Sequence, residues 1–399
     1  MKTQRMIIKQ GVIARHTEGL RRYFGWPTVC CDENGVLYAI VSRRMIHVDP
    51  FGQVCLYRSY DGGETWSEAQ VIIDDIFDDR DAGICYLGNG KMIMSFFHHP
   101  LKWYKKDQMY YKWWTGGVGR FCTEQDRDEA LAKMDEYPEE LAYGASYVLV
   151  SEDYGKTWGE KVHLPISCPH GPSRMNDGRL IMVGTPHNLE DYKRVTGDET
   201  PYFAHGEPLC VIVSEDGGKS WKKLCDVSTT MDDRSKGGVC ASVEPHIIQL
   251  KDGTLVIAYR YCNDSEYRRI GEHTLTYLTF SYNGGTRWTY PVPAKNCDGE
   301  IVIGSPPHLL ETADGAVVLS YSRRATPTGI RAMISYDGGH SWGEEIILGQ
   351  NWNPEDDDLG YPATAQLPTG ELVTVAYRKY FDDPLPCFMY TKWRQKSRQ

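Results

Sequence analysis

An eight-residue motif that recurs along the chain restricts the possible folds more than any other feature of the sequence. Its five copies read SYDGGETW (59–66), SEDYGKTW (151–158), SEDGGKSW (214–221), SYNGGTRW (281–288) and SYDGGHSW (335–342). Each copy follows a run of strand-forming residues, and its Asp or Asn with glycine supplies the positive φ angles of a tight hairpin turn. The motif therefore predicts a repeated strand–turn–strand corner.

A second pattern, a strand, a glycine turn and another strand, occurs six times. The six segments are 27–41, 82–96, 171–184, 244–260, 306–323 and 361–378. Each of the first five precedes a copy of the motif, so the repeating unit is a pair of hairpins, and the last unit lacks the motif. A β-sandwich would not need six equivalent units, whereas six blades around an axis leave few exposed sheet edges. We therefore expect residues 1–399 to form one all-β domain, a six-bladed β-propeller.

The segment 98–145 interrupts this regularity after the first hairpin of blade two. It begins with clustered aromatic residues, namely Trp103, Tyr104, Tyr110, Tyr111, Trp113 and Trp114. It continues with a helical pattern that starts at Thr123 and contains no glycine before Gly144. We expect a partly helical, aromatic-rich insertion, whose rings could cover a bound sugar as a lid or could form a subunit interface in a homo-oligomer.

Charge and composition exclude several classes of function. The net charge of −10 argues against nucleic acid or anionic membranes as the main partner. The N-terminal segment has no apolar stretch of the length that a secretory signal needs, and no later stretch approaches a membrane span, so we expect a cytoplasmic protein. The twelve cysteines are scattered without CxxC pairs, which predicts reduced thiols, and we expect no metal and no cofactor.

The repeated motif resembles the Asp-box, S-x-D-x-G-x-[TS]-W, of sialidases and related proteins. Together with the matching hairpins, the resemblance covers nearly the whole chain. It implies a sialidase-type propeller in which the boxes are structural corners on the face away from the active site. Function must therefore be sought at the opposite face.

Residues that enter or leave the first hairpin of each blade should line this opposite face, the mouth of the propeller. The entering residues are Trp26, Arg80, Asp81, His170, Glu244, His308 and Tyr361, and the leaving residues are Arg43, Arg44, His98, His99, Arg260, Arg323, Arg324 and Arg378. A single arginine at a strand end usually pairs with a nearby carboxylate. So many arginines in an acidic chain instead indicate an anionic ligand, because a guanidinium binds a carboxylate with two hydrogen bonds. We predict an acidic sugar or oligosaccharide substrate.

The resemblance also implies roles for individual residues. In sialidases a Glu that opens the fourth blade polarises a Tyr that opens the sixth, and the Tyr attacks the anomeric carbon; VEPH (243–246) and GYPA (360–363) match these segments. This predicts Tyr361 as nucleophile and Glu244 as its partner. Arg260 and either Arg323 or Arg324 match two members of the sialidase arginine triad.

Two positions depart from the sialidase pattern. FGWP (24–27) places Gly25 where the family has the first arginine of its triad, and Arg378 stands where the family has the Glu that steadies this arginine. The two changes could compensate each other, with Arg378 supplying the missing guanidinium.

The general acid is predicted from two acidic segments. In the loop MIHVDPFG (45–52), Asp49 matches the sialidase acid, and His47 is a rival. In DDRDAG (78–83), Asp79 and Asp81 could orient a sugar hydroxyl, supply the acid or brace Arg80. A general acid must keep its proton near neutral pH, so apolar surroundings, such as the ring of Trp26, would help.

These residues predict an exo-acting, retaining glycoside hydrolase that releases a terminal acidic sugar such as sialic acid. One alternative is a polysaccharide lyase acting on uronic acids, with a Tyr or with His170, His246 or His308 as the base. Another is a non-catalytic sugar-binding propeller, which the departure at Gly25 would favour.

Overall fold

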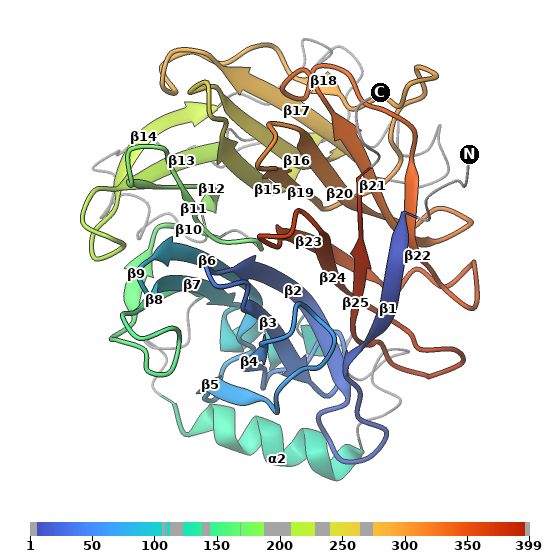
Figure 1. Ribbon diagram of the computed structural model, residues 1–399. Coiled ribbons are helices and arrows are strands. Elements are labelled where there is room, and N and C mark those ends of the chain that lie inside the picture. Colours follow the sequence, from blue (N-terminus) through green and yellow to red (C-terminus); the bar gives the residue numbers. More distant parts are fainter. Residues whose placement is uncertain are drawn as a thin grey trace.

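The computed structural model describes residues 6–105, 108, 110–111, 123–137, 144–167, 169–186, 209–227, 240–263 and 274–395. Six antiparallel sheets surround a central axis, with their first strands toward the middle (Figure 1). The predicted all-β, six-bladed propeller is therefore confirmed. No helix in these ranges is long and apolar enough to cross a membrane.

The strands of the first three blades follow the order of the sequence. Blade one contains β2 (Tyr23–Cys31), β3 (Leu37–Arg44), β4 (Gln53–Ser59) and β5 (Gln70–Asp74), and blade two contains β6 (Arg80–Gly88), β7 (Lys91–His98), β8 (Ala145–Ser151) and β9 (Val162–Leu164). Blade three contains β10 (Ile166–Ser167), β11 (Ser173–Arg174), β12 (Leu180–Pro186), β13 (Leu209–Ser214) and β14 (Lys222–Val227).

The fourth and fifth blades repeat the same arrangement. Blade four contains β15 (Cys240–Gln249), β16 (Leu255–Asn263), β17 (Leu275–Ser281) and β18 (Val292–Pro293), and blade five contains β19 (Pro307–Glu311), β20 (Val317–Arg323), β21 (Gly329–Ser335) and β22 (Ile346–Gln350).

Blade six is completed by the N-terminal part of the chain. It contains β23 (Gly360–Gln366), β24 (Leu372–Arg378) and β25 (Cys387–Trp393), and its outermost strand is β1 (Ile7–Ala14). β1 pairs antiparallel with β25, from Ile7 opposite Trp393 to Ala14 opposite Phe388. The unit that lacks an Asp-box thus obtains its fourth strand from the other end of the sequence.

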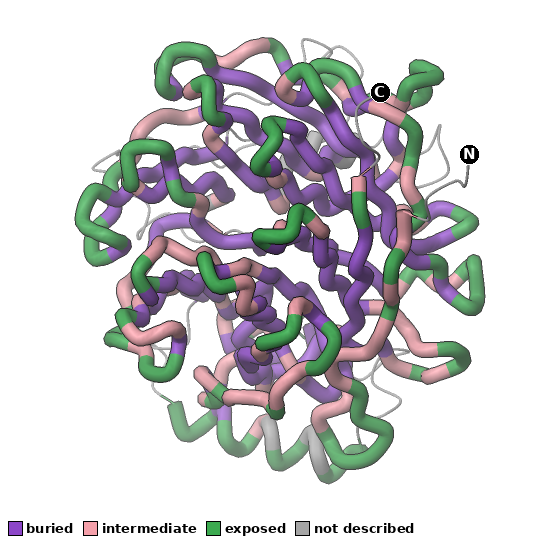
Figure 2. The backbone as a smooth tube through the Cα atoms, viewed as in Figure 1, coloured by how far each residue is buried: buried purple, intermediate pink, exposed green. Residues whose placement is uncertain are grey.

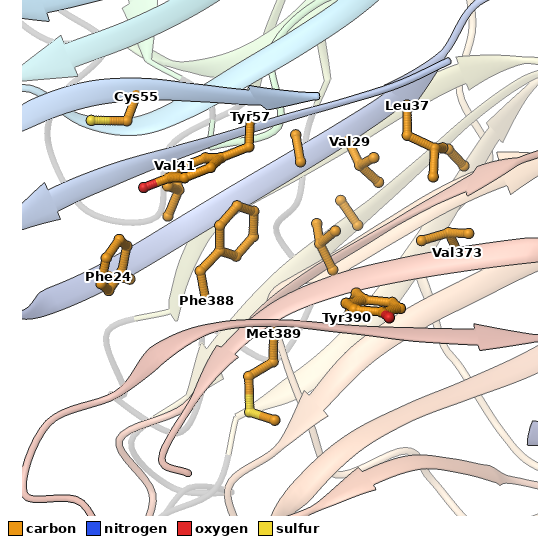
Figure 3. Packing of buried hydrophobic residues seen from close by; sticks show 14 of the residues in the cluster. Phe24, Val29, Leu37, Val41, Cys55, Tyr57, Val373, Phe388, Met389 and Tyr390 are labelled. Atoms are coloured by element: carbon orange, nitrogen blue, oxygen red, sulfur yellow. The ribbon is translucent and has the colours of Figure 1, made fainter. Parts of the chain in front are cut away.

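Each pair of neighbouring blades shares one buried hydrophobic cluster, so six clusters close the ring. Figure 3 shows the cluster between the first and last blades, where Phe24 and Tyr57 pack with Phe388 and Tyr390. Burial of one such side chain contributes about 1.5–3 kcal/mol. Burial is greatest along the strands, and the peripheral turns are exposed (Figure 2).

The Asp-boxes form the corners that the sequence predicts. In the first copy, the Gly63 N–H donates to Ser59 Oγ at 2.8 Å and the Thr65 N–H donates to Asp61 Oδ1 at 2.9 Å. Gly62 and Gly63 have φ angles of 69° and 91°, which a residue with a side chain rarely adopts. Burial raises the pKa of Asp61, but the hydrogen bonds from Thr65 and Ser59 outweigh this effect and lower it to about 2.

The insertion lies between β7 and β8 and contains η1 (Leu101–Tyr104) and α2 (Glu124–Asp135), which lies at the edge of the molecule in Figure 1. Tyr104 and Tyr110 are buried, together with Met45 and Ile46 of blade one, so these rings are occupied within the chain. The predicted lid or interface residues Trp113 and Trp114 lie outside the described residues.

Candidate active site

Four residues at the inner strands of the propeller share an unusual backbone conformation. Trp26, Asp81, Glu244 and Tyr361 have positive φ angles of 55°, 53°, 51° and 51°, in blades one, two, four and six. At each of them the first strand of the blade gains one residue relative to the second, which is a β-bulge. The same local distortion therefore recurs four times around the channel.

These bulges determine where the four side chains point. A positive φ at a bulky residue costs on the order of 1–3 kcal/mol and persists where the surroundings impose it, commonly at functional sites. Proline follows at Pro27, Pro245 and Pro362. Since proline has no N–H to contribute to the ladder, it is tolerated at such a bulge.

Tyr361 and Glu244 form the central pair of the site. The Tyr361 hydroxyl donates to Glu244 Oε1 at 2.6 Å, and Arg260 Nη1 lies 2.9 Å from both oxygens of the same carboxylate. The three residues that the sequence assigns to nucleophile, partner and triad arginine are thus in direct contact.

The protonation states follow from these contacts. Burial raises the pKa of Glu244, but the charge of Arg260 and the hydrogen bond from Tyr361 outweigh it and leave the pKa below its ordinary value. Glu244 is therefore an ionised carboxylate that can accept a proton. Burial and the nearby Glu244 charge raise the pKa of Tyr361 well above its ordinary value, so the phenol keeps its proton in the resting site.

Asp81 lies beside this pair with its proton available. The residue is 6% exposed, and its Oδ1 has no hydrogen-bond partner among the described residues. Burial and the charge of Glu244 outweigh the opposing charge of Arg80 and raise the pKa of Asp81 to about 7. A carboxyl group with these properties can donate a proton at neutral pH.

Asp49 occupies a different environment from the one that the family match suggests. It is fully buried, and its two oxygens accept hydrogen bonds from the Met45 N–H at 2.6 Å and the Phe51 N–H at 2.9 Å. Its carboxylate therefore fastens its own loop. The structure provides Asp81, and not Asp49, as the carboxyl group beside Tyr361 and Glu244.

His47 belongs to a hydrogen-bonded group at the edge of the site. Its Nδ1 lies 2.6 Å from the hydroxyl of Tyr23, which donates to Asp358 at 2.7 Å. Burial lowers the pKa of His47, although Asp358 opposes this shift. The imidazole packs edge-on against Trp26 with ring centroids 5.2 Å apart, so it supports the site from one side.

Trp26 is a platform for arginines and leaves little surface for a sugar. The indole is 1% exposed, and the guanidinium carbons of Arg80 and Arg44 lie 4.0 and 4.8 Å from its ring centre. Such cation–π contacts hold a guanidinium in place. The predicted substrate-binding role of Trp26 is thus better described as positioning Arg80.

Arg80 is further held by the buried carboxylate Asp78, 3.5 Å from its Nη1. Asp78 also accepts hydrogen bonds from the His99 N–H at 2.7 Å and from the Tyr104 hydroxyl. Tyr104 of the insertion therefore helps to position Arg80 through their shared partner Asp78.

The structure distinguishes the two adjacent arginines of blade five. Arg324 lies at the mouth, where its Nε donates to the Leu359 carbonyl and its Nη2 to the Tyr377 hydroxyl, both at 3.1 Å. The charges of Glu244 and Tyr361 also act on it. Arg323 instead has a buried Nε without a partner in the described part of the chain. Arg324 is therefore the member of the pair that joins the site.

Arg378 does not replace the arginine that is missing at Gly25. Its Nη1 donates to the Gln350 carbonyl at 3.2 Å, and the side chain packs against Gly349 of blade five. Its neighbour Tyr377 instead points to the centre, with its ring 6.1 Å from that of Tyr361. The compensation that the sequence suggested is contradicted, because the strand alternation at the end of β24 directs Arg378 outward.

Three histidines line the channel beneath Tyr361. The rings of His170, His246 and His308 lie within 5.5 Å of one another, and His170 lies 6.4 Å from the ring of Tyr361. Nδ1 of His246 accepts the Leu309 N–H at 3.0 Å, and Nδ1 of His308 accepts the Thr364 N–H at 3.4 Å. Burial lowers the pKa of all three, that of His246 to about 3. All three are thus neutral, and His246 and His308 link the inner strands of neighbouring blades.

The sequence did not reveal several residues that complete the site. Asp78, Tyr23, Asp358 and Tyr377 hold His47, Arg80 and Arg324 in place. Asp78 and Asp358 lie in short acidic runs directly before Asp81 and Tyr361. This proximity to predicted site residues could have identified them from the sequence. Tyr23 and Tyr377 read as ordinary strand aromatics.

The fold and the mouth residues together define a propeller of the sialidase type. A family model described as "BNR repeat-like domain" matches residues 142–374, and one described as "BNR/Asp-box repeat" matches residues 57–68. The chain therefore belongs to the BNR repeat-like domain family. No protein with a curated description matches it.

Several solved structures share this fold at low sequence identity. A protein of unknown function from Dyadobacter fermentans is 20% identical, with a TM-score of 0.69 over 98% of this chain and 99% of its own. The NanB sialidase from Streptococcus pneumoniae is 14% identical, with a TM-score of 0.62 over 96% of this chain and 70% of its own. The α-L-arabinofuranosidase Arb93A from Fusarium graminearum is 14% identical, with a TM-score of 0.59 over 98% of both chains. The propeller is thus one that glycoside hydrolases use.

Proposed function

We propose that the protein is an exo-acting, retaining glycoside hydrolase that releases a terminal acidic sugar such as sialic acid. The observation that carries the proposal is the 2.6 Å hydrogen bond between Tyr361 and the ionised Glu244, with the proton-bearing Asp81 beside it. This combination contains a nucleophile, its base and a general acid, which are the groups that a retaining mechanism requires.

The first step uses Tyr361 as the nucleophile. As Tyr361 Oη attacks the anomeric carbon, Glu244 takes the phenolic proton, and the bond from the sugar to the leaving oxygen breaks. Arg260 and Arg324 oppose the rise in the pKa of Tyr361, so they stabilise the phenolate character that develops in this step. Two inversions at the anomeric carbon, by Tyr361 and then by water, retain its configuration.

Asp81 protonates the leaving oxygen in this scheme and then accepts a proton from the attacking water in the second step. Water breaks the bond between Tyr361 and the sugar, and Glu244 returns its proton to the phenolate. Asp81 suits both roles, because a pKa of about 7 places the carboxyl group near equal populations of acid and base at neutral pH.

The acidic sugar follows from the charge of the mouth. Arg324 is half-buried and makes two hydrogen bonds to neutral oxygens, those of the Leu359 carbonyl and the Tyr377 hydroxyl, and no carboxylate among the described residues is bonded to it. A carboxylate on the substrate would supply this counter-charge. A neutral phenol is a suitable nucleophile beside such a substrate, since a carboxylate nucleophile would be repelled.

The lyase alternative has less support from the geometry. Two of its three candidate histidine bases, His246 and His308, already use Nδ1 as an acceptor for backbone N–H groups, and all three histidines are buried in the channel. The hydrolase mechanism uses Tyr361, Glu244 and Asp81 together. A propeller that only binds sugars would not require this combination of residues.

The test is release of 4-methylumbelliferone from its α-sialoside, its glucuronide and its neutral α-L-arabinofuranoside. We expect release from an acidic conjugate, with the first-formed free sugar seen by NMR in the configuration of the substrate. An inverted first product would contradict the Tyr nucleophile. An unsaturated, ultraviolet-absorbing product would favour the lyase, and binding of free sialic acid without any release would favour the sugar-binding propeller.

A further inference from the structure

A second cleft opens on the mouth face between blades five and six, apart from the Tyr361 site. It has a volume of about 480 Å³. It is lined by the last residues of β22 and β24, by residues that follow these strands, and by one residue of β1: Gln350, Arg378, Trp352, Tyr380, Phe381 and Gln10. This volume suits a ligand of the size of one or two sugar rings. The cleft therefore has the dimensions of a binding site.

Two large aromatic rings stand exposed at this cleft. Trp352 is 69% exposed and Phe381 is 55% exposed, and their ring centres lie 5.6 Å apart in an edge-to-face arrangement. Phe381 adopts a φ of 52°, a strained backbone for a bulky residue. Exposed aromatic rings are unfavourable in water unless a partner covers them, and the apolar face of a sugar ring stacks on such surfaces.

A guanidinium without a counter-charge lies beside these rings. Arg378 makes a single hydrogen bond, to the Gln350 carbonyl at 3.2 Å, and no ion pair with any described carboxylate. Burial lowers the pKa of Arg378, and the nearby Cys387 thiol opposes this shift without cancelling it. By contrast, Arg15 nearby is paired with Asp383 through two hydrogen bonds of 2.6 and 2.7 Å.

The cleft is connected to the mouth by one short loop. This loop follows β22 at Trp352 and reaches Asp358, which accepts the hydrogen bond from Tyr23 beside His47, and then Leu359, whose carbonyl binds Arg324. Asp358 is six positions after Trp352, so the two residues are at most about 22 Å apart. A glycan held at the mouth can therefore extend into the cleft.

We propose that this cleft binds a second carboxylated sugar, with its ring on Trp352 and its carboxylate on Arg378. The inference rests on the proposed function for the origin of the ligand, an acidic glycan whose terminal sugar occupies the mouth. It assigns to Arg378 a carboxylate-binding role at a site separate from Tyr361. The substrates preferred by the enzyme would then carry more than one acidic sugar.

The test is a titration of the full chain, labelled with 5-fluorotryptophan, followed by ¹⁹F NMR. The Trp352 resonance is assigned with Trp352→Phe, and N-acetylneuraminic acid and uncharged galactose are the two probes. We expect the Trp352 resonance to shift as N-acetylneuraminic acid is added. The dissociation constant obtained from this shift should be at least tenfold higher for galactose. For N-acetylneuraminic acid it should be at least tenfold higher in Arg378→Met. Arg15→Met is the matched control, since Arg15 already has a partner, and it should leave the titration unchanged.

Two further outcomes separate this inference from the proposed function. Arg324→Lys should weaken binding at the mouth and leave the Trp352 titration intact. If no conjugate is hydrolysed and Trp352 still titrates through Arg378, the proposed function fails and the second site stands. A Trp352 resonance that does not shift, or that responds equally to galactose or in Arg378→Met, overturns the inference.

Discussion

The hydroxyl of Tyr361 donates a 2.6 Å hydrogen bond to Glu244, a residue 117 positions earlier in the chain. Both residues occupy the same kind of strained bulge, in blades six and four. The contact therefore depends on closure of the ring as well as on the two local conformations.

Tyr361→Phe removes the proposed nucleophile and leaves the ring in place. We expect turnover of an acidic aryl glycoside to fall on the order of 10³-fold or more, because the covalent step is lost. The dissociation constant for free N-acetylneuraminic acid, measured by calorimetry, should change little. Unchanged turnover would refute the assignment of Tyr361.

Asp81→Asn should lower the rate for substrates with poor leaving groups by about 10²–10⁴-fold, with a much smaller loss for an activated aryl leaving group that needs no protonation. In the unmodified enzyme, kcat/KM should fall as the pH rises above about 7, since Asp81 must be protonated for the first step. The matched variant Asp49→Asn should lower thermal stability and keep this leaving-group pattern. Equal losses for both leaving groups in Asp81→Asn would exclude Asp81 as the acid.

Arg324→Lys and Arg323→Lys form a matched pair at adjacent positions. The guanidinium at the mouth should be needed for the substrate carboxylate, so Arg324→Lys should raise KM about tenfold or more, as expected for the loss of charge-assisted hydrogen bonds. Arg323→Lys should have little effect on KM. Steady-state kinetics on one acidic conjugate would decide, and a larger effect at Arg323 would contradict the proposed geometry.

Asp216→Ala should destabilise the fold without affecting the site, because the carboxylate ties an Asp-box turn through the Ser220 N–H at 2.9 Å. We expect Tm to fall by about 2 °C. Burial raises the pKa of Asp216, but its hydrogen bonds from Ser220 and Ser214 outweigh this effect and lower the pKa from the ordinary value of 3.8 to about 2. The contribution of the box is thus present above about pH 4 and is lost as the pH falls toward 2. Glu215→Gln, in the same turn, is the control for calorimetry.

The stability of the protein should also depend on pH through the histidines of the channel. His246 stays neutral in the folded protein because burial lowers its pKa to about 3, whereas an unfolded chain protonates it near pH 6.5. The unfolded state therefore binds more protons below that pH, and stability should fall as the pH decreases from about 6.5. His246→Asn should flatten this dependence of Tm on pH, and the exposed His340→Asn should not. A slope that is the same in all three proteins would show that His246 does not contribute to it.

The sequence was sufficient for the architecture, because repetition multiplies a weak local signal. Five turns with the same glycines and six matching hairpins leave few alternatives, and the positions of Tyr361 and Glu244 follow from the blade order. The N-terminal strand of blade six carries no motif, so its pairing with β25 could not be read from local pattern.

The individual roles at the mouth were harder to predict, because they depend on side-chain direction. Strand alternation alone places Arg378 and Tyr377 on opposite faces, but the register that decides between them is set by the bulge at Tyr361. Likewise, both Asp49 and Asp81 are candidates for the general acid when only the sequence is considered. Only the three-dimensional arrangement reveals that one fastens a loop and the other faces the nucleophile.

The pairing of β1 with β25 has a consequence for biosynthesis. About 370 residues separate these strands, so at 5–20 residues per second the first strand waits roughly 20–75 s on the ribosome for its partner. During this interval the last blade is unfinished and its first-made edge is open to other chains. The polar residues Lys9 and Gln10 in β1 lower the risk that this waiting edge aggregates before the ring closes.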